Sequence, residues 1–429
     1  MADFNLSVIL DAIRRAPNGL SRVQLAGLVG LAPQTVSNIC RRLLDQELII
    51  EAGKQTTGPG KPRTMLRLNP QGMYAVGVHI DPSVTTYAVL DLAGGQILRR
   101  QHPTDAAAGP DRVIEDMANQ VLELIRDSGV ATARIAGVGV ATPGPIDARH
   151  GALADPPDLP GWNRVLLRDR LAEATALPVL VDKDVTAAAV AEIWKGGANG
   201  TGSFVFFYLG TGIGCGMVLN GEVVRGSSGN AGEIGHIVAD PEGRDCDCGK
   251  RGCVKVMCMP RTLVAEAREA GVLPDDDGPQ DGGARDGVAE RGGTRDGGSA
   301  ADRESGQDSG RQSLPEQMAA LSQAAASGNA AARGILDRSA VRVGMAVSVV
   351  TNLLDVERVV FGGPFWGYLR EFYLDRVPAL IRERSVTSGV HSVEVVGTGV
   401  GDDVGAFGAA CLVLENRLAP HAAKLLLTD

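Results

Sequence analysis

The first 45 residues carry apolar side chains at helical spacing in three segments, which are separated by residues that favour turns. The first segment ends at the Pro-Asn-Gly sequence of 17–19. Ser21 is placed to cap a second helix over 22–29. A third helix is expected over 33–45, because a proline at its first position lacks only an N–H that would have no partner in the helix. The last two helices are joined by a short turn.

The polar side of the third helix is rich in side chains that can hydrogen-bond DNA. Together with Arg22 of the second helix, these residues are Gln34, Thr35, Ser37, Asn38, Arg41 and Arg42. Gln, Asn and Arg bond base edges in a major groove, and Ser and Thr reach bases or phosphates. We therefore predict DNA binding, although a three-helix protein-interaction module would show the same polar face.

Two short strands are expected after the third helix, over 48–51 and 63–68. The loop between them is rich in Gly, Pro and Lys, and Lys61 and Arg63 lie near its tip. A basic β-hairpin in this position is the wing of a winged helix-turn-helix. The sequence thus predicts an all-α-plus-wing DNA-binding domain over residues 1–70.

From residue 73 onward, apolar strand patterns alternate with helical patterns, which predicts an α/β body in two lobes. Strands are expected at 75–80, 85–90, 96–100, 135–140, 179–181, 204–209, 214–219, 358–361 and 393–397. Helices are expected at 110–127, 164–174, 185–194, 330–354, 368–384 and 403–414. The body is assigned to residues 71–429.

The net charge of −9 hides two opposite parts. Residues 1–68 hold nine Lys and Arg against five acids, a surplus of four positive charges, so the rest of the chain carries −13. A basic segment on an acidic body is typical of a nucleic-acid-binding arm. No run of eighteen apolar residues and no secretory signal pattern occurs, so we expect a cytoplasmic protein without a membrane span.

Residues 274–313 have the composition of a disordered insertion. They contain ten Gly, ten acids and five Arg, and no Leu, Ile, Met or aromatic residue. Such a segment has little apolar surface to bury. We interpret it as a low-complexity spacer within the body, with a dedicated partner site as the alternative.

Four potential metal ligands fall within eighteen residues, in the order His236, Cys246, Cys248 and Cys253. One imidazole and three thiolates suit a closed, tetrahedral zinc site with a structural role. Cys258 is a possible competing ligand, but it lies in a more apolar stretch. The seven cysteines of the chain are too few for a disulfide scaffold.

A glycine-rich turn lies between two expected strands, with Gly210, Thr211, Gly212 and Gly214 as its core. Its amide groups can cradle a phosphate, but a tight hairpin that needs glycine only for its backbone angles would look the same. Asp184 follows a strand at a sheet edge, where it could act as a general base or cap the next helix.

Several segments together resemble the ROK family (repressor, open reading frame, kinase) of the sugar kinase–hexokinase–actin superfamily. They are Gly-Glu-Ile-Gly-His at 232–236, Cys-Asp-Cys-Gly-Lys-Arg-Gly-Cys at 246–253, Leu-Pro-Gly-Trp-Asn at 159–163, Thr-Pro-Gly-Pro at 142–145 and Phe-Gly-Gly-Pro at 361–364. The resemblance implies a two-lobed actin/hexokinase-like (ribonuclease H-like) body. It also implies that Asp184 holds the position of the family's base, that Glu233 and His236 contact sugar hydroxyls, and that His236 also binds zinc.

Three positions depart from the pattern of the family's kinases. Where the resemblance places their Asp-x-Gly-x-Thr phosphate loop, this chain has Asp-Pro-Ser-Val-Thr at 81–85, and proline stiffens a turn that must approach phosphate closely. Lys183 and Lys255 replace the residues expected beside the sugar. Two lysines suit a ligand with phosphate or carboxylate groups, unless both point to solvent.

The combined reading is a DNA-binding transcriptional regulator of carbohydrate-related genes, with no catalytic residue expected to act. Its body would sense a sugar or sugar derivative, and a homodimer or homotetramer would bind double-stranded operator DNA with paired half-sites. The rival interpretation is an active ATP-dependent sugar kinase that carries a DNA-binding arm.

Overall fold

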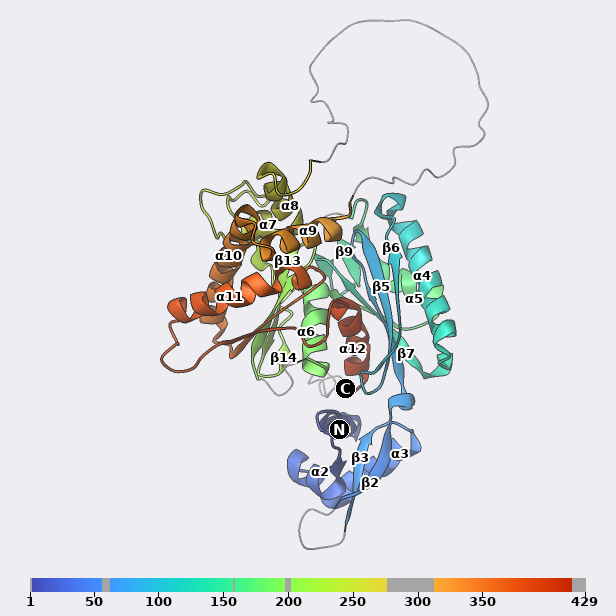
Figure 1. Ribbon diagram of the computed structural model, residues 1–429. Helices are drawn as coiled ribbons and strands as arrows, with labels where there is room; N and C mark the ends of the chain where they lie inside the picture. Colours follow the sequence, from blue (N-terminus) through green and yellow to red (C-terminus); the bar gives the residue numbers. More distant parts are fainter. Residues whose placement is uncertain (1, 56–61, 157–158, 197–201, 276–311, 419–429) are drawn as a thin grey trace, which may run out of the picture.

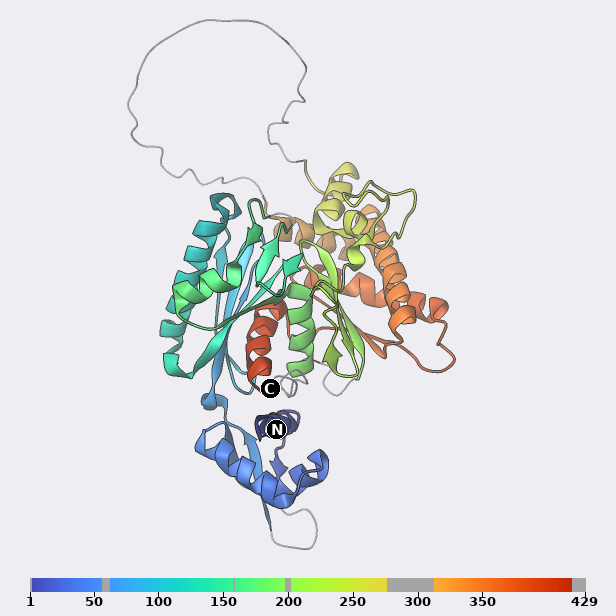
Figure 2. The same ribbon diagram turned by 180° about the vertical axis from the view of Figure 1, so that it is seen from behind.

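The computed structural model describes residues 2–55, 62–156, 159–196, 202–275 and 312–418 (Figure 1). Lys61 and nearly all of the expected insertion at 274–313 lie outside these ranges. A small N-terminal arm is attached to a larger body of two lobes, and the view from behind shows the same arrangement (Figure 2). Among the described residues, no helix has the length and apolar character that a membrane span requires.

The arm has the predicted winged helix-turn-helix architecture. Its elements are α1 (Ala2–Arg14), β1 (Leu20–Ser21), α2 (Arg22–Val29), α3 (Pro33–Asp45), β2 (Ile49–Gln55) and β3 (Arg63–Leu68). Ser21 caps α2 as expected: its hydroxyl accepts the Gln24 N–H, and the Gln24 side chain in turn accepts the Ser21 N–H. The three strands form one sheet in the order β1-β3-β2.

The first lobe is built on a five-stranded sheet in the order β11-β7-β4-β5-β6. Its strands are β4 (Tyr74–His79), β5 (Val84–Asp91), β6 (Gln96–Pro103), β7 (Ile135–Thr142) and β11 (Val179–Lys183). β5 is antiparallel to its neighbours β4 and β6, whereas β7 is parallel to β4 and β11 is parallel to β7. The outer face is covered by α4 (Gly109–Ser128) and α5 (Leu167–Thr175) (Figure 2).

The second lobe repeats this topology, with the strand order β14-β13-β12-β15-β16. The strands are β12 (Phe204–Leu209), β13 (Ile213–Leu219), β14 (Glu222–Val223), β15 (Arg358–Gly362) and β16 (Glu394–Gly397). The helices are α7 (Val254–Cys258), α8 (Pro260–Glu269), α9 (Leu314–Ala326), α10 (Ala330–Leu354) and α11 (Trp366–Arg384). Two similar sheets facing each other form the α/β, two-lobed fold that the resemblance implied.

Two helices fill the space between the sheets: α6 (Asp184–Trp194) and α12 (Val404–Leu418) (Figure 1). Their approach is close, because a Cβ atom on Gly408 would overlap the carbonyl oxygen of Ala187. α6 begins directly after β11, so its first residue lies at the edge of the first-lobe sheet. This position brings the end of β11 to the space between the lobes.

The sequence prediction differs from the structure most in two parts of the body. The helix expected over 164–174 begins only at Leu167, because residues Asn163–Val165 form a short strand, β10, that pairs with β9 (Ala152–Ala154). β8 (Ile146–Asp147) completes that small sheet. α7, α8 and α9 were not predicted at all.

Candidate functional site

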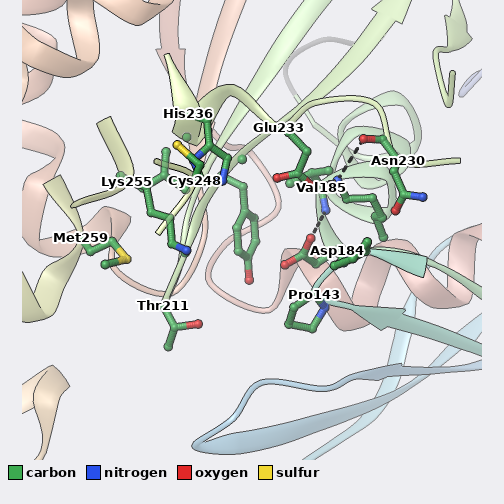
Figure 3. A pocket seen from close by; sticks show the side chains of 18 of the residues that line it. Pro143, Asp184, Val185, Thr211, Asn230, Glu233, His236, Cys248, Lys255 and Met259 are labelled. Carbon is green, nitrogen blue, oxygen red and sulfur yellow. Dashed lines mark hydrogen bonds and ion pairs between the residues drawn. The ribbon is translucent and has the colours of Figure 1, made fainter. Parts of the chain in front are cut away.

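A cavity of about 490 Å³ lies between the two lobes, at the end of β11 and the start of α6. The side chains drawn in Figure 3 approach it from both lobes, with Asp184 and Pro143 from the first and Thr211, Glu233 and His236 from the second. The sequence-predicted Asp184, Glu233, His236, Lys183 and Lys255 all line it. The fold thus brings together residues that are as much as 72 positions apart in the sequence.

Asp184 is the first residue of α6 and not its cap, because Lys183 occupies the cap position. One carboxylate oxygen of Asp184 accepts the Val185 N–H at 2.7 Å. Burial raises the pKa of Asp184 to about 7, against the opposing effects of that hydrogen bond and of Lys183. The carboxyl group therefore changes protonation near neutral pH, as a general base or a hydroxyl-binding group would.

Lys183 does not point to solvent. Its side chain is only 3% exposed, and its ammonium group forms an ion pair with Glu233. The same nitrogen lies 3.3 Å from the carbonyl oxygen of Ala231. The Glu233 carboxylate is 57% exposed toward the cavity. The positive charge of Lys183 is therefore already compensated by the protein.

Lys255 is paired as well. Its Nζ lies 2.7 Å from Oδ2 of Asp247, a residue that sequence reasoning had not singled out. Hydrogen bonds from Lys255 and from the Cys246 thiol lower the pKa of Asp247 to about 2, so this carboxyl group is ionised at neutral pH. An anionic ligand would have to compete with Asp247 for Lys255 and with Glu233 for Lys183.

The glycine-rich turn of the second lobe faces the end of β4 across the cavity. The Thr211 hydroxyl donates to Oδ2 of Asp81 at 3.1 Å, while the Ser83 hydroxyl and N–H both donate to the other oxygen at 2.6 and 3.0 Å. Gly212 lines the cavity, its φ is not in the left-handed region, and a Cβ on it would meet no atom within 4 Å. Its backbone angles therefore do not require glycine, and its bare backbone faces the cavity.

His236, Cys246, Cys248 and Cys253 converge beside the cavity, and one potential ligand atom of each lies within 4.8 Å of all the others. The Cys248 and Cys253 sulfur atoms are 3.6 Å apart, and Cys246 Sγ is 3.5 Å from Nδ1 of His236. A tetrahedral zinc ion with Zn–S bonds of about 2.3 Å needs ligand separations of roughly 3.5–3.8 Å, so the residues fit a metal. Cys258 instead faces the carbonyl oxygen of Ser339.

The candidate DNA-binding surface lies on α3 and on the wing of the arm. Gln34, Asn38, Arg41 and Arg42 are exposed, and Thr35 and Ser37 are half-buried. The Ser37 hydroxyl donates to the carbonyl oxygen of Pro33 at 2.8 Å. Arg22 pairs with Glu51 of the wing at 3.3 Å, and Arg63 is exposed at the start of β3. On the opposite side of α3, Val36, Cys40 and Leu43 are fully buried. The helix therefore has one polar and one apolar face, as the sequence predicted.

Besides Asp247, sequence reasoning missed Tyr208 and Asn230, which also line the cavity. Tyr208 lies at its wall, with its hydroxyl 3.3 Å from Nε2 of the buried His79. The Asn230 side chain accepts the N–H of Ile146 and donates to its carbonyl oxygen, so it joins the two lobes. Tyr208 sits in an apolar strand pattern, and Asn230 in a glycine-rich loop. Neither context distinguishes a cavity residue from an ordinary one.

Comparisons with known proteins agree with this architecture. Residues 75–416 match the profile of the ROK family, and residues 8–50 match that of a winged helix-turn-helix DNA-binding domain. A glucokinase of Halalkalibacterium halodurans is 30% identical over 67% of this chain and 79% of its own. A xylose repressor of Caldicellulosiruptor bescii is 21% identical over 93% of both chains.

Among solved structures, a ROK family transcriptional regulator described as a homologue of the Escherichia coli MLC protein superposes over 97% of both chains. Its TM-score is 0.74 at 22% sequence identity, so it supports the fold, including the arm. The ROK profile covers most of the body, and the arm precedes it in the same chain. The protein therefore belongs to the ROK family and carries an N-terminal winged helix-turn-helix.

Proposed function

We propose that the protein is a DNA-binding transcriptional regulator whose ROK body senses a sugar. The observation that carries the proposal is the presence, in one chain, of a winged helix-turn-helix and of a cavity lined by Asp184, Glu233 and His236. A relative that matches over 93% of this chain is a xylose repressor, whereas the glucokinase match covers 67% of this chain.

The charges of the cavity favour an uncharged, hydroxyl-rich effector. Both lysines are compensated by Glu233 and Asp247, and Asp184 adds negative charge when it ionises. Carboxylates and an imidazole are suitable partners for sugar hydroxyls. A phosphate or carboxylate group on the ligand would meet no uncompensated lysine here. Of the sugar or sugar derivative that the sequence suggested, we therefore favour a neutral sugar over a derivative with a phosphate or carboxylate group.

We infer that the protein does not act as a sugar kinase. Both oxygens of Asp81 are engaged by Ser83 and Thr211, and Pro82 stands in the turn where phosphate would approach. The rival interpretation, supported by the family base position at Asp184, is tested by phosphate transfer from ATP to glucose and xylose. Turnover at ordinary enzyme rates, about 1–1000 per second, that disappears in Asp184→Asn would contradict our proposal.

We propose zinc as the resident metal, held by His236, Cys246, Cys248 and Cys253. A closed set of three thiolates and one imidazole gives the ion a structural role. Because Nδ1 of His236 faces the cluster, the ring is held with its other nitrogen on the opposite side. The cluster would thereby fix His236 and the segment that carries Glu233.

A regulator of this kind would act as a homodimer or homotetramer, because two arms on paired half-sites multiply the contacts with the operator. The effector would act by binding one arrangement of the lobes more tightly than another. The proposal is tested by selecting duplex DNA with the full chain from a random library and measuring its affinity with and without glucose or xylose. Undiminished affinity after deletion of residues 1–70 would contradict DNA binding through the arm.

A further inference from the structure

One helix reaches from the effector cavity to the DNA-binding arm. The first residues of α6, Asp184 and Val185, line the cavity, and its last residue, Trp194, contacts α1 of the arm. Eleven residues of α-helix span about 16 Å at 1.5 Å per residue. A single secondary structure element thus has its two ends at the two sites whose coupling the proposed function requires.

The helix α6 is enclosed by the rest of the body along most of its length. Every residue from Val185 to Glu192 is buried. It packs against α12 so closely that Gly408 admits no side chain, as described above. The buried Glu192 accepts the N–H of Gly399 at 3.0 Å. A tightly packed helix of this kind transmits a displacement at one end to the other as a rigid-body shift.

The contact at the arm is specific in chemistry and geometry. The guanidinium carbon of Arg14 lies 4.7 Å from the centroid of the Trp194 ring. Arg14 is held there by Asp11 of its own helix, at 2.7 Å, and its side chain is only 9% exposed. A desolvated guanidinium group attracts an aromatic ring electrostatically and can also lie flat on it, which an ammonium group cannot do, so the position of the Trp194 ring affects the position of α1.

Arg14 also interacts electrostatically with a carboxyl group on α12. Arg14 and Arg225 both lower the pKa of the Glu415 carboxyl on α12, although burial raises it overall. Arg225 in turn pairs with Asp182 at 2.8 Å, two residues before Asp184 on β11. The residues that flank Arg14 on the body are thus attached to the segment that forms the cavity wall.

We propose that α6 couples the cavity to the DNA-binding arm, with Trp194 as the positioning residue that holds Arg14 and hence α1. This inference rests on the proposed function, because it assigns the route by which sugar binding alters operator affinity. Sugar contacts at Asp184 would shift α6, and the displaced Trp194 ring would move or release Arg14. The arm would then present its DNA-binding surface differently to the two half-sites.

The test measures the ratio of operator affinities with and without sugar in the full chain. The DNA is a duplex selected by the wild-type chain, and the probes are glucose and xylose. Typical couplings between two sites change affinity by about 5- to 150-fold. We expect Arg14→Lys and Trp194→Leu to reduce the ratio to below about twofold, while the sugar affinity of the DNA-free protein stays near the wild-type value. Lysine keeps the charge beside Asp11 but loses the flat group that stacks on indole.

Arg15→Lys is the matched control. Arg15 also pairs with Asp11, at 2.8 Å, but its side chain is 56% exposed and is not the one stacked on Trp194. It should keep the wild-type ratio. If Trp194 has only a structural role, Trp194→Leu should lower thermal stability, and the folded variant should keep the wild-type ratio of operator affinities with and without sugar.

Each outcome decides the matter. A wild-type ratio in Arg14→Lys overturns the inference, whatever the result for Trp194→Leu. If Trp194→Leu does not fold, Arg14→Lys against Arg15→Lys decides alone. If neither sugar changes the operator affinity of the wild-type chain, the sensing function fails, and the inference fails with it. Failure of the sensing function is distinguishable from failure of the coupling through α6, because it is seen in the wild-type chain before any variant is made.

Discussion

The DNA-binding face of α3 and the cavity between the lobes use polar side chains in opposite ways. On α3, Gln34 and Asn38 are exposed and share one hydrogen bond of 3.3 Å with each other. In the cavity, Lys183 and Lys255 are paired with acids, and Asp184 bonds the backbone. Substitution of exposed side chains changes stability little, whereas removal of the acid from a cavity pair leaves a lysine without its partner. Pocket substitutions should therefore act on stability and α3 substitutions on DNA recognition.

The largest expected effect is that of metal removal. Chelation should lower the stability of the body by several kcal/mol, on the order of 10 °C in Tm, because a structural metal contributes its binding free energy to folding. Calorimetry with and without chelator, together with metal analysis, measures the change. Cys253→Ser should lose the metal, whereas Cys258→Ser should keep it. Native protein free of zinc would refute the metal assignment.

Removing Glu233 and removing Lys183 should lower the free energy of unfolding by different amounts, although either substitution breaks the ion pair between them. Glu233→Met leaves a buried ammonium group without its acid, which costs on the order of 3 kcal/mol. Lys183→Met removes the buried charge and leaves a carboxylate that water can reach, so it should cost less than about 1 kcal/mol. Urea unfolding of both variants provides the values. Equal losses would contradict the view that this pair compensates a buried lysine.

The pKa of Asp184 predicts a pH dependence of stability. An unfolded chain releases this proton near pH 4, and the folded protein releases it only at about 7, so stability falls as pH rises between these values. We expect Asp184→Asn to remove about 2–4 kcal/mol of this decline. Unfolding free energies of the two proteins at pH 5 and pH 7.5 measure it. Parallel curves would show that Asp184 ionises normally.

The smallest expected effect on stability is on α3. Gln34→Ala and Asn38→Ala should change the free energy of unfolding by less than about 0.5 kcal/mol. They should nevertheless relax base preference by about 1–3 kcal/mol at the positions that they contact. Arg63→Ala on the wing should instead weaken binding to all sequences and reduce the salt slope by about one. Selection of duplex DNA by each variant separates the two kinds of loss.

Elements set by local sequence features could be predicted from the sequence, whereas elements set by tertiary contacts could not. The bounds of α2, α3 and β3 agree with the prediction because local features such as the Ser21 cap and Pro33 determine them. The β10 strand depends on pairing with β9, and the five-residue α7 is too short to show a periodic pattern. Such elements form through tertiary contacts, which periodicity does not report.

Some residues of the candidate site were also recognisable from the sequence, whereas the pairing of its lysines was not. The candidate metal-binding cluster was recognisable because its four residues are close in sequence and combine one His with three Cys. The partner of Lys183 lies 50 positions away, and nothing in the sequence indicated that Glu233 would compensate it. The sequence therefore left two alternatives for the lysines, which were contact with an anionic group of the ligand or exposure to solvent. The fold brings each one to an acid, and this changes the ligand chemistry that the cavity favours.

The contact between Arg14 and Trp194 also makes the protein its own optical reporter. The chain has three tryptophans, and the other two, Trp162 and Trp366, are buried within the first and second lobes respectively. Indole emission responds to the polarity and charge around the ring. With Trp162 and Trp366 replaced by phenylalanine, the remaining fluorophore would be Trp194, and its emission would follow the docking of the arm in real time, without a dye or labelled DNA.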